Sequence, residues 1–271
     1  MVAIEIDSRF APVLESVAAQ HHNVSVVIGD ALHIDYNHYF PSKKKSQRAE
    51  AEEVQIVASL PFHISEPFMS LITHFPLASV VLVVGDKLAA EIQAREKNSY
   101  FGRLSLLAEA FFEVIKLRDI PKSDFYPVPR TDASLIELTP LESSEVSGSR
   151  RRYILRKLFL TERKSPLVKN VLKETLIVWE RVRHSANLSK EGTNRRDRRN
   201  VRANLRQLTN PRGGEAISSA EDGRRRPVAL TQNEARSLIV QMGLPEPLLS
   251  KPFSQLNNQE LVLLSKALGD K

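Results

Sequence analysis

The stretch VQIVASLPFHISEPF, residues 54–68, decides the fold of this chain. Its first five residues are mostly apolar, which is typical of a short buried β-strand. Pro61 ends the strand, because proline cannot donate to a β-ladder, and Ser65 followed by Glu66 and Pro67 is typical of a capped helix start. A strand, a tight turn and a helix in this order place residues 59–62 at the carboxyl edge of a sheet, where open α/β folds bind ligands.

Two acidic residues come after predicted strands upstream of this stretch. Residues 2–6 and 24–28 are strand candidates, and apolar residues recur at helical spacing between them. Glu5 lies at the end of the first strand and Asp30 comes just after the second. One carboxylate can accept both hydrogen bonds of a ribose diol and the other can accept from an adenine amine, as in half of a nucleotide-binding α/β unit. The alternative is that Glu5 and Asp30 only cap a strand and a helix.

The downstream half of the predicted sheet ends in a proline-rich loop. Residues 80–84 and 112–117 are strand candidates, with helices predicted between them. Pro127 and Pro129 then force an extended, rigid loop within residues 125–134, before a last strand at Leu135.

These segments resemble, in the same order, the motifs of the ribosomal RNA adenine N6,N6-dimethyltransferase family. The resemblance is carried by residues 2–7, 29–32, 59–62 and 125–134. It implies an α/β fold with a Rossmann-like class I methyltransferase core and a small all-α C-terminal domain. It also implies S-adenosylmethionine as cofactor and N6,N6-dimethylation of adenines in small-subunit ribosomal RNA.

The resemblance implies which residues hold the cofactor. Glu5 would accept from the ribose of S-adenosylmethionine and Asp30 from its adenine. The predicted cofactor-binding residues are Glu5, Ile6, Asp30, Ala31 and Ser59.

The resemblance also implies which residues hold the target adenine. Its exocyclic amine is a poor nucleophile, so Ser59 and the carbonyl region of Leu60 and Pro61 would hold the amine and direct its lone pair to the methyl donor. The rings of Phe62 and Phe125 would sandwich the base once it has left its stack. The predicted catalytic residues are therefore Ser59, Leu60, Pro61, Phe62 and Phe125.

The chain departs from the family pattern at two places. Ser59 stands where the family usually has asparagine, and its hydroxyl is shorter than an amide. The family's opening strand and glycine-rich turn, which cradle the methionine part of the cofactor, are not found before Glu5. By family topology that strand is central, so we expect a sheet interrupted between the strands of Glu5 and Ser59, and weak binding of S-adenosylmethionine by this chain.

Composition limits the remaining possibilities. The 271 residues include no cysteine, which excludes disulfides and thiolate metal sites, and the seven histidines lack ligand spacing, so we expect no metal site. No apolar stretch approaches the length of a membrane span, and we expect a cytoplasmic monomer. Residues 150–226 hold 22 Lys and Arg against 8 Asp and Glu, which gives this segment +14 and leaves −7 for the remainder. A basic segment on an acidic body indicates a polyanionic partner, here ribosomal RNA of the small subunit.

The predicted organisation is a methyltransferase core over residues 1–140, a linker over 141–149, and a basic helical RNA-binding domain over 150–271. Residues 184–228 are predicted to be a mobile segment, because arginines dominate and apolar periodicity is weak. Two other functions fit the same motifs. One is a catalytically impaired RNA- or DNA-binding relative, as in the mitochondrial transcription-factor branch of the superfamily. The other is methylation of large-subunit ribosomal RNA.

Overall fold

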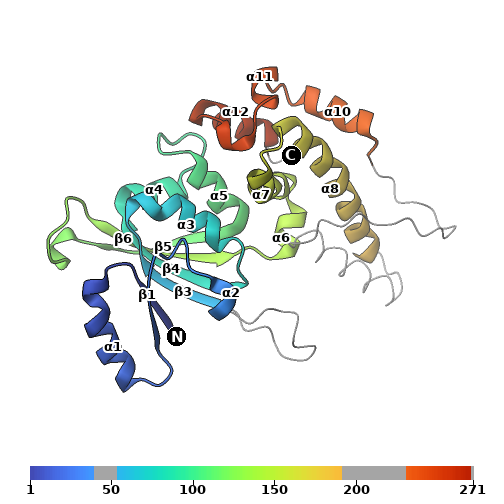
Figure 1. Ribbon diagram of the computed structural model, residues 1–271. Coiled ribbons are helices and arrows are strands. Elements are labelled where there is room, and N and C mark those ends of the chain that lie inside the picture. The colour runs from blue at the N-terminus through green and yellow to red at the C-terminus, as the bar shows by residue number, and fades with distance from the viewer. Residues whose placement is uncertain (40–53, 191–229, 270–271) are drawn as a thin grey trace.

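The computed structural model of the chain describes residues 1–39, 54–190 and 230–269. All strands of these ranges come before residue 141, and the elements after that residue are helices (Figure 1). The strands are β1 (Val2–Glu5), β2 (Ser25–Ile28), β3 (Val54–Ser59), β4 (Leu77–Gly85), β5 (Phe112–Ile120) and β6 (Ala133–Pro140). The α-helices of the first half are α1 (Ala11–Gln20), α2 (Tyr36–Tyr39), α3 (Ser65–Ile72), α4 (Asp86–Gln93) and α5 (Arg103–Phe111). The later α-helices are α6 (Ser143–Gly148), α7 (Arg150–Thr161), α8 (Val168–Lys190), α10 (Gln232–Gln241), α11 (Glu246–Leu249) and α12 (Asn258–Leu268). Short 3₁₀ turns add η1 (Ser8–Phe10), η2 (Phe62–Ile64), η3 (Lys122–Asp124), η4 (Glu162–Lys164) and η5 (Phe253–Gln255).

The strands form two sheets with a break between them. β1 and β2 pair in parallel, with Glu5 opposite Ile28. The second sheet has the order β3-β4-β6-β5, in which β3 and β4 are parallel and β6 is antiparallel to both of its neighbours. The strand carrying Glu5 and the strand carrying Ser59 are therefore in different sheets, as expected for a sheet interrupted between them. The α/β fold with a mixed sheet and packed helices confirms the predicted fold class.

The strand β3 is buried on one side only, and the prediction of a buried strand was wrong on this point. Its side chains alternate between half-buried and exposed, and Val57 is 82% exposed. β3 lies at an edge of its sheet, and among the described residues no element covers the face that bears Val57. An apolar run in the sequence indicates the strand but not the number of faces that are covered.

Helices α3, α4 and α5 cover the other face of the four-stranded sheet (Figure 1). The fully buried side chains on the two sides of this contact include Leu82 and Ile136 of the sheet and Met69, Leu88 and Leu106 of the helices. Truncating one of these to alanine is expected to cost about 2–5 kcal/mol. This layer fixes the end of β3 and the start of α3, between which the predicted catalytic turn lies.

The C-terminal helices continue the same hydrophobic core. Buried residues of α7, α8 and α12 belong to one cluster with those of the sheet and α5. The predicted linker over residues 141–149 contains helix α6, whose Val146 is fully buried against Tyr153 and Trp179. Of the predicted mobile segment, residues 184–190 continue helix α8, and residues 191–228 lie outside the described ranges.

A buried arginine joins the two halves of the chain. Helical periodicity places Arg151 on a polar face of its helix, but its side chain is only 8% exposed. Its guanidinium binds both carboxylate oxygens of Glu109 on α5, at 2.5 and 3.0 Å, and lies 2.7 Å from Glu96. It also donates to the carbonyl and hydroxyl oxygens of Ser265 on α12. The sequence period could not indicate this, because the partners come from three distant segments.

Candidate functional site

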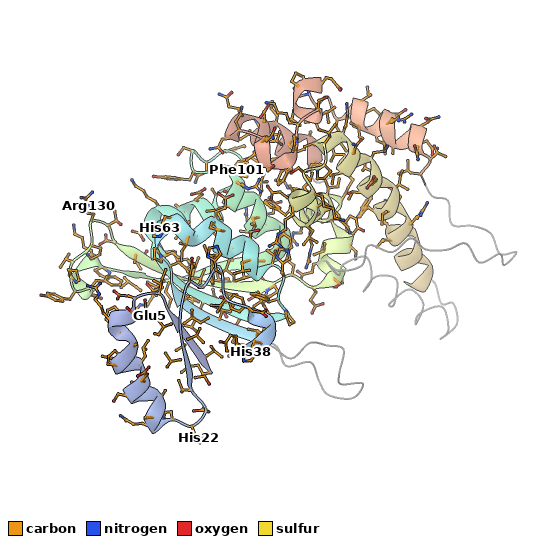
Figure 2. All side chains as sticks on the ribbon, viewed as in Figure 1. Glu5, His22, His38, His63, Phe101 and Arg130 are labelled. Carbon is orange, nitrogen blue, oxygen red and sulfur yellow. The ribbon has the colours of Figure 1, made fainter. Side chains whose placement is uncertain are left out.

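The carboxyl ends of several strands meet at one edge of the fold. β3 and β4 are parallel, and β5 runs in the same direction because β6 is antiparallel to both β4 and β5. The turn after β3 and the loop after β5 therefore lie at the same edge of the sheet. Figure 2 shows Glu5, His63 and Arg130, which end or come after β1, β3 and β5, toward one side of the molecule, away from His22.

Glu5 ends β1, and Asp30 comes two residues after the end of the neighbouring strand β2. The backbone N–H of Gly29 donates to the carbonyl of Glu5 at 2.8 Å, which fixes the two strand ends side by side. One carboxylate oxygen of Glu5 accepts from the backbone N–H of Asp7 at 2.8 Å. Within the described residues this is the one hydrogen bond that the Glu5 carboxylate accepts, which leaves it spare acceptor capacity.

Asp30 organises the turn after β2. Its two oxygens accept from the backbone N–H of Leu32 at 2.9 Å and contact Nδ1 of His33 at 2.7 Å. The hydrogen bond from Leu32, followed by that from His33, lowers the pKa of Asp30 and keeps it ionised at neutral pH. Asp30 thus caps the turn at residues 31–33 rather than a helix, and each carboxylate oxygen retains a second acceptor position. The next residue, Ala31, accepts the hydroxyl of Tyr36 through its carbonyl at 2.7 Å.

The turn after β3 places Ser59 at the end of the strand with an exposed side chain. The backbone N–H of Leu60 donates to the Val83 carbonyl at 3.0 Å and holds the turn against β4. The carbonyl of Pro61 accepts from the Ser65 hydroxyl at 3.1 Å and from the Ile64 N–H at 3.2 Å. Ser65 was predicted to cap α3, but Ile64 occupies the cap position and the buried Ser65 hydroxyl binds the turn instead.

The loop after β5 carries Phe125 and is tied to the sheet by residues to which the sequence motifs gave no role. A carboxylate oxygen of Asp132 accepts from the backbone N–H of Lys122 at 2.8 Å, which closes the loop at its base. The Asp132 carbonyl accepts from the N–H of Asp86 at 3.2 Å, and the Ser134 hydroxyl donates to the Asp86 carboxylate at 2.7 Å. These contacts fix the loop to the carboxyl end of β4. The sequence signal that could have indicated these contacts is TDAS at residues 131–134, where polar residues lie just before and at the start of the apolar strand β6.

Of the two aromatic rings predicted to stack on the target base, the structure describes that of Phe125 but not that of Phe62. Phe125 comes directly after η3 and is half-buried, whereas its neighbour Tyr126 is fully exposed. The backbone of Phe62 begins η2, next to Ser59, but its side chain lies outside the described parts of the chain. The sandwich of a base between Phe62 and Phe125 therefore stays a prediction.

A separate hollow of about 380 Å³ lies behind α3, away from these residues. It is lined by Glu66, Arg103 and Glu162 together with small and apolar side chains. Arg103 lies 2.6 Å from Glu66, pairs with Glu162, and packs over the rings of Phe159 and Phe253 at 5.1 and 4.9 Å. Since its charge is neutralised within the chain, we assign Arg103 a structural role, and the candidate site remains the strand edge.

Two further findings concern the described residues as a set. They contain no group of three or more His, Cys, Asp or Glu placed to hold a metal ion. They also contain no helix that is long and apolar enough to cross a bilayer.

The chain is similar to known proteins over most of the segments described above. Residues 1–192 match the family model described as ribosomal RNA adenine dimethylase. A protein named ribosomal RNA small subunit methyltransferase A, from Oceanobacillus iheyensis, is 32% identical over 141 residues, which cover 51% of this chain and 47% of that protein. The protein of the same name from Natranaerobius thermophilus is 27% identical over 184 residues, covering 63% of this chain and 61% of that one.

A crystal structure of a dimethyladenosine transferase from Plasmodium falciparum matches with 22% identity and a TM-score of 0.45, over 89% of this chain and 81% of that one. The chain spans about half to three fifths of the length of the curated relatives named above. Because the family model covers well over half of it, the chain belongs to the ribosomal RNA adenine dimethylase family.

Proposed function

We propose that this chain serves the S-adenosylmethionine-dependent N6,N6-dimethylation of adenines in small-subunit ribosomal RNA. Family membership supports the reaction class, and the curated relatives are named as small-subunit methyltransferases. The observation that carries the proposal is the tie between the Phe125 loop and the carboxyl end of β4, through Asp86, Asp132 and Ser134. This tie holds the loop of Phe125 at the edge of the sheet where Ser59 ends β3.

The residues at the ends of β1 and β2 fit the adenosine part of the cofactor. The free acceptor capacity of Glu5 suits ribose hydroxyls, and the ionised Asp30 suits an adenine amine. Ile6 is 69% exposed directly beside Glu5, and Ala31 adjoins Asp30, so both offer apolar contact to the nucleoside. When bound, S-adenosylmethionine supplies the sulfonium methyl group that the reaction transfers.

The turn after β3 narrows the choice of atoms that would hold the target amine. The Pro61 carbonyl already accepts two hydrogen bonds from within the chain. We therefore assign the role of acceptor to the Leu60 carbonyl together with the exposed hydroxyl of Ser59. Two acceptors fix both amine protons and direct the nitrogen lone pair toward the methyl group, and positioning of this kind supplies most of the rate gain. No side chain need act as a base, since the proton can leave once the amine has become cationic.

Phe125, with Phe62, is proposed to stack on the flipped adenine. Stacking on an aromatic side chain contributes about 1–3 kcal/mol per base, which helps to hold a base outside its helix.

The basic C-terminal half is proposed to bind the ribosomal RNA backbone. The proposed site of action is the cytoplasm, where small subunits are assembled. The monomeric state remains a prediction.

One alternative has a specific observation in its favour. Ser59 is a shorter acceptor than the asparagine usual in the family, and such a change would slow methyl transfer without affecting RNA binding. The alternative is therefore an RNA-binding relative that is catalytically impaired.

The test is methyl transfer from S-adenosylmethionine to purified small ribosomal subunits, with nucleoside analysis of the product. The cofactor is supplied at millimolar concentration, so that weak binding does not hide transfer. We expect N6,N6-dimethyladenosine with small subunits and none with large subunits. RNA binding without any methylated adenine would support the binding alternative. Methylated product only on large subunits would show that large-subunit ribosomal RNA is the substrate.

A further inference from the structure

Buried donors without acceptors lie in one row along α7. Among the atoms of the described residues, Nε of Arg150, the hydroxyl of Tyr153 and Nε of Arg156 are buried and have no hydrogen-bond partner. Residues three or four apart are neighbours on a helix, so Arg150, Tyr153, Arg156 and Lys157 form one row, called here the α7 row. Native proteins leave few buried polar groups unpaired. Three of them in one row indicate an acceptor that the described chain does not supply.

The α7 row is also positively charged without a counter-ion. In the described part of the chain, no Asp or Glu pairs with Arg150, Arg156 or Lys157. The acids Glu109 and Glu180 on neighbouring helices pair with other arginines. Burial lowers the pKa of Arg156, and burial together with the charge of Arg156 lowers the pKa of Lys157. No acid occupies the first turn of α7, so the positive end of the helix dipole adds to this charge.

An arrangement of this kind costs stability unless an anion is bound. A buried charge without a partner is unfavourable, and Tyr153 is only 3% exposed with its hydroxyl unpaired. The guanidinium of Arg156 packs over the ring of Phe111 at 4.9 Å, which fixes its plane. Arginine presents a planar fork of donors that matches phosphate oxygens, and the arginines of the row remain half-exposed to solvent.

We propose that the α7 row is a phosphate-binding site, in which Arg150, Arg156 and Lys157 neutralise the anion and the Tyr153 hydroxyl donates to it. The phosphate belongs either to a nucleic-acid backbone or to the free inorganic anion. The backbone form rests on the proposed function, whereas binding of the free anion does not.

The first experiment measures thermal unfolding of the full chain in chloride and in 50 mM phosphate at equal ionic strength. We expect phosphate to raise the Tm of the wild type by about 2–5 °C, from ligand linkage at a millimolar Kd. Arg156→Gln and Tyr153→Phe are expected to lose this rise while keeping or exceeding the wild-type Tm in chloride, because each removes an unpaired buried donor. Arg236→Gln, which replaces an exposed arginine on α10, is the matched control and should retain the rise.

The second experiment measures binding of a single-stranded ribosomal RNA fragment against salt concentration. Each lost phosphate contact should reduce the slope of log K against log salt by about 0.7, so the slope of Arg156→Gln should fall below those of the wild type and Arg236→Gln. A change in both experiments assigns the row to a nucleic-acid phosphate, and a change in the first alone assigns it to the free anion.

The proposal is overturned if phosphate leaves the wild-type Tm unchanged. It is also overturned if Arg156→Gln and Tyr153→Phe both unfold far below the wild type in chloride, since that result would reveal partners within the chain. Loss of methyl transfer with the phosphate effect intact would count against the proposed function only.

Discussion

Replacing Arg151 with methionine tests the joint between the sheet and the C-terminal helices. Methionine keeps much of the side-chain volume but leaves Glu109 and Glu96 without their cation, and these carboxylates are only 17% and 29% exposed. Breaking a buried ion pair by removing one partner costs about 3–5 kcal/mol. We therefore expect Arg151→Met to lower the free energy of unfolding by about 3–5 kcal/mol, measured by urea denaturation.

The matched control is Arg183→Met, which removes an exposed pair with Glu180 on α8. Its arginine is 56% exposed, and exposed pairs contribute about 0–1 kcal/mol. The double variant Arg151→Met/Glu109→Gln should recover part of the loss, because Glu109, the more buried of the two carboxylates, is no longer charged and unpaired. Equal costs for the two arginine variants, or a double variant less stable by the full sum of the single changes, would refute the reasoning.

The ion pairs of Arg151 with Glu96 and Glu109 also predict how the stability of the chain depends on pH. Burial raises the pKa of Glu96, but hydrogen bonds from Ser265 and Arg151 outweigh it, and the pKa in the folded chain is lowered. A carboxyl group with a lowered folded pKa contributes stability above its unfolded pKa, near 4.5, and this stability is lost as the pH falls through the folded value. As the pH falls below about 5, the free energy of unfolding should therefore decrease less in Arg151→Met than in the wild type.

The aromatic loop, the α7 row and the open sheet face each give a further prediction. Ser134→Ala removes the hydrogen bond to Asp86 that ties down the aromatic loop, and we expect methyl transfer to fall by about tenfold to a hundredfold with an unchanged circular dichroism spectrum; full activity would exclude a positioning role. Burial raises the pKa of Tyr153 to about 12, so its contribution to stability should be lost as the pH rises from about 10 through 12, and Tyr153→Phe should reduce the alkaline loss of stability in phosphate-free urea titrations; the same alkaline loss in both proteins would contradict it. Val57→Lys on the open sheet face should change the free energy of unfolding by less than about 0.5 kcal/mol, whereas Val80→Lys in the core should prevent folding; strong destabilisation by Val57→Lys would mean that this face is covered.

Much of the strand edge could be predicted from sequence, because strand ends and turns are encoded locally. Glu5 and Asp30 each come after an apolar run, and Pro61 ends β3 where a proline must end it. The break in the sheet between the strands of Glu5 and Ser59 was also predicted, from the sheet topology that the family resemblance implies.

Contacts between distant segments could not be predicted in this way. The tie from Asp86 to Ser134 depends on the antiparallel return of β6 beside β4, and a strand pattern alone does not identify a pairing partner. The burial of Arg151 depends on acids from two other segments, so helical periodicity places it on the surface. The open face of β3, marked by Val57, depends on which elements pack against the sheet rather than on the strand itself.

The most direct test of the account is Phe125→Ala, assayed in parallel for methyl transfer to small ribosomal subunits, for RNA affinity and for binding of S-adenosylmethionine. The account predicts that N6,N6-dimethyladenosine disappears from the nucleoside digest while cofactor binding remains at the wild-type level and RNA binding weakens only by the loss of one stacked base. Wild-type methylation by Phe125→Ala, or an equal loss of methylation and cofactor binding, would contradict the placement of the target adenine against this ring.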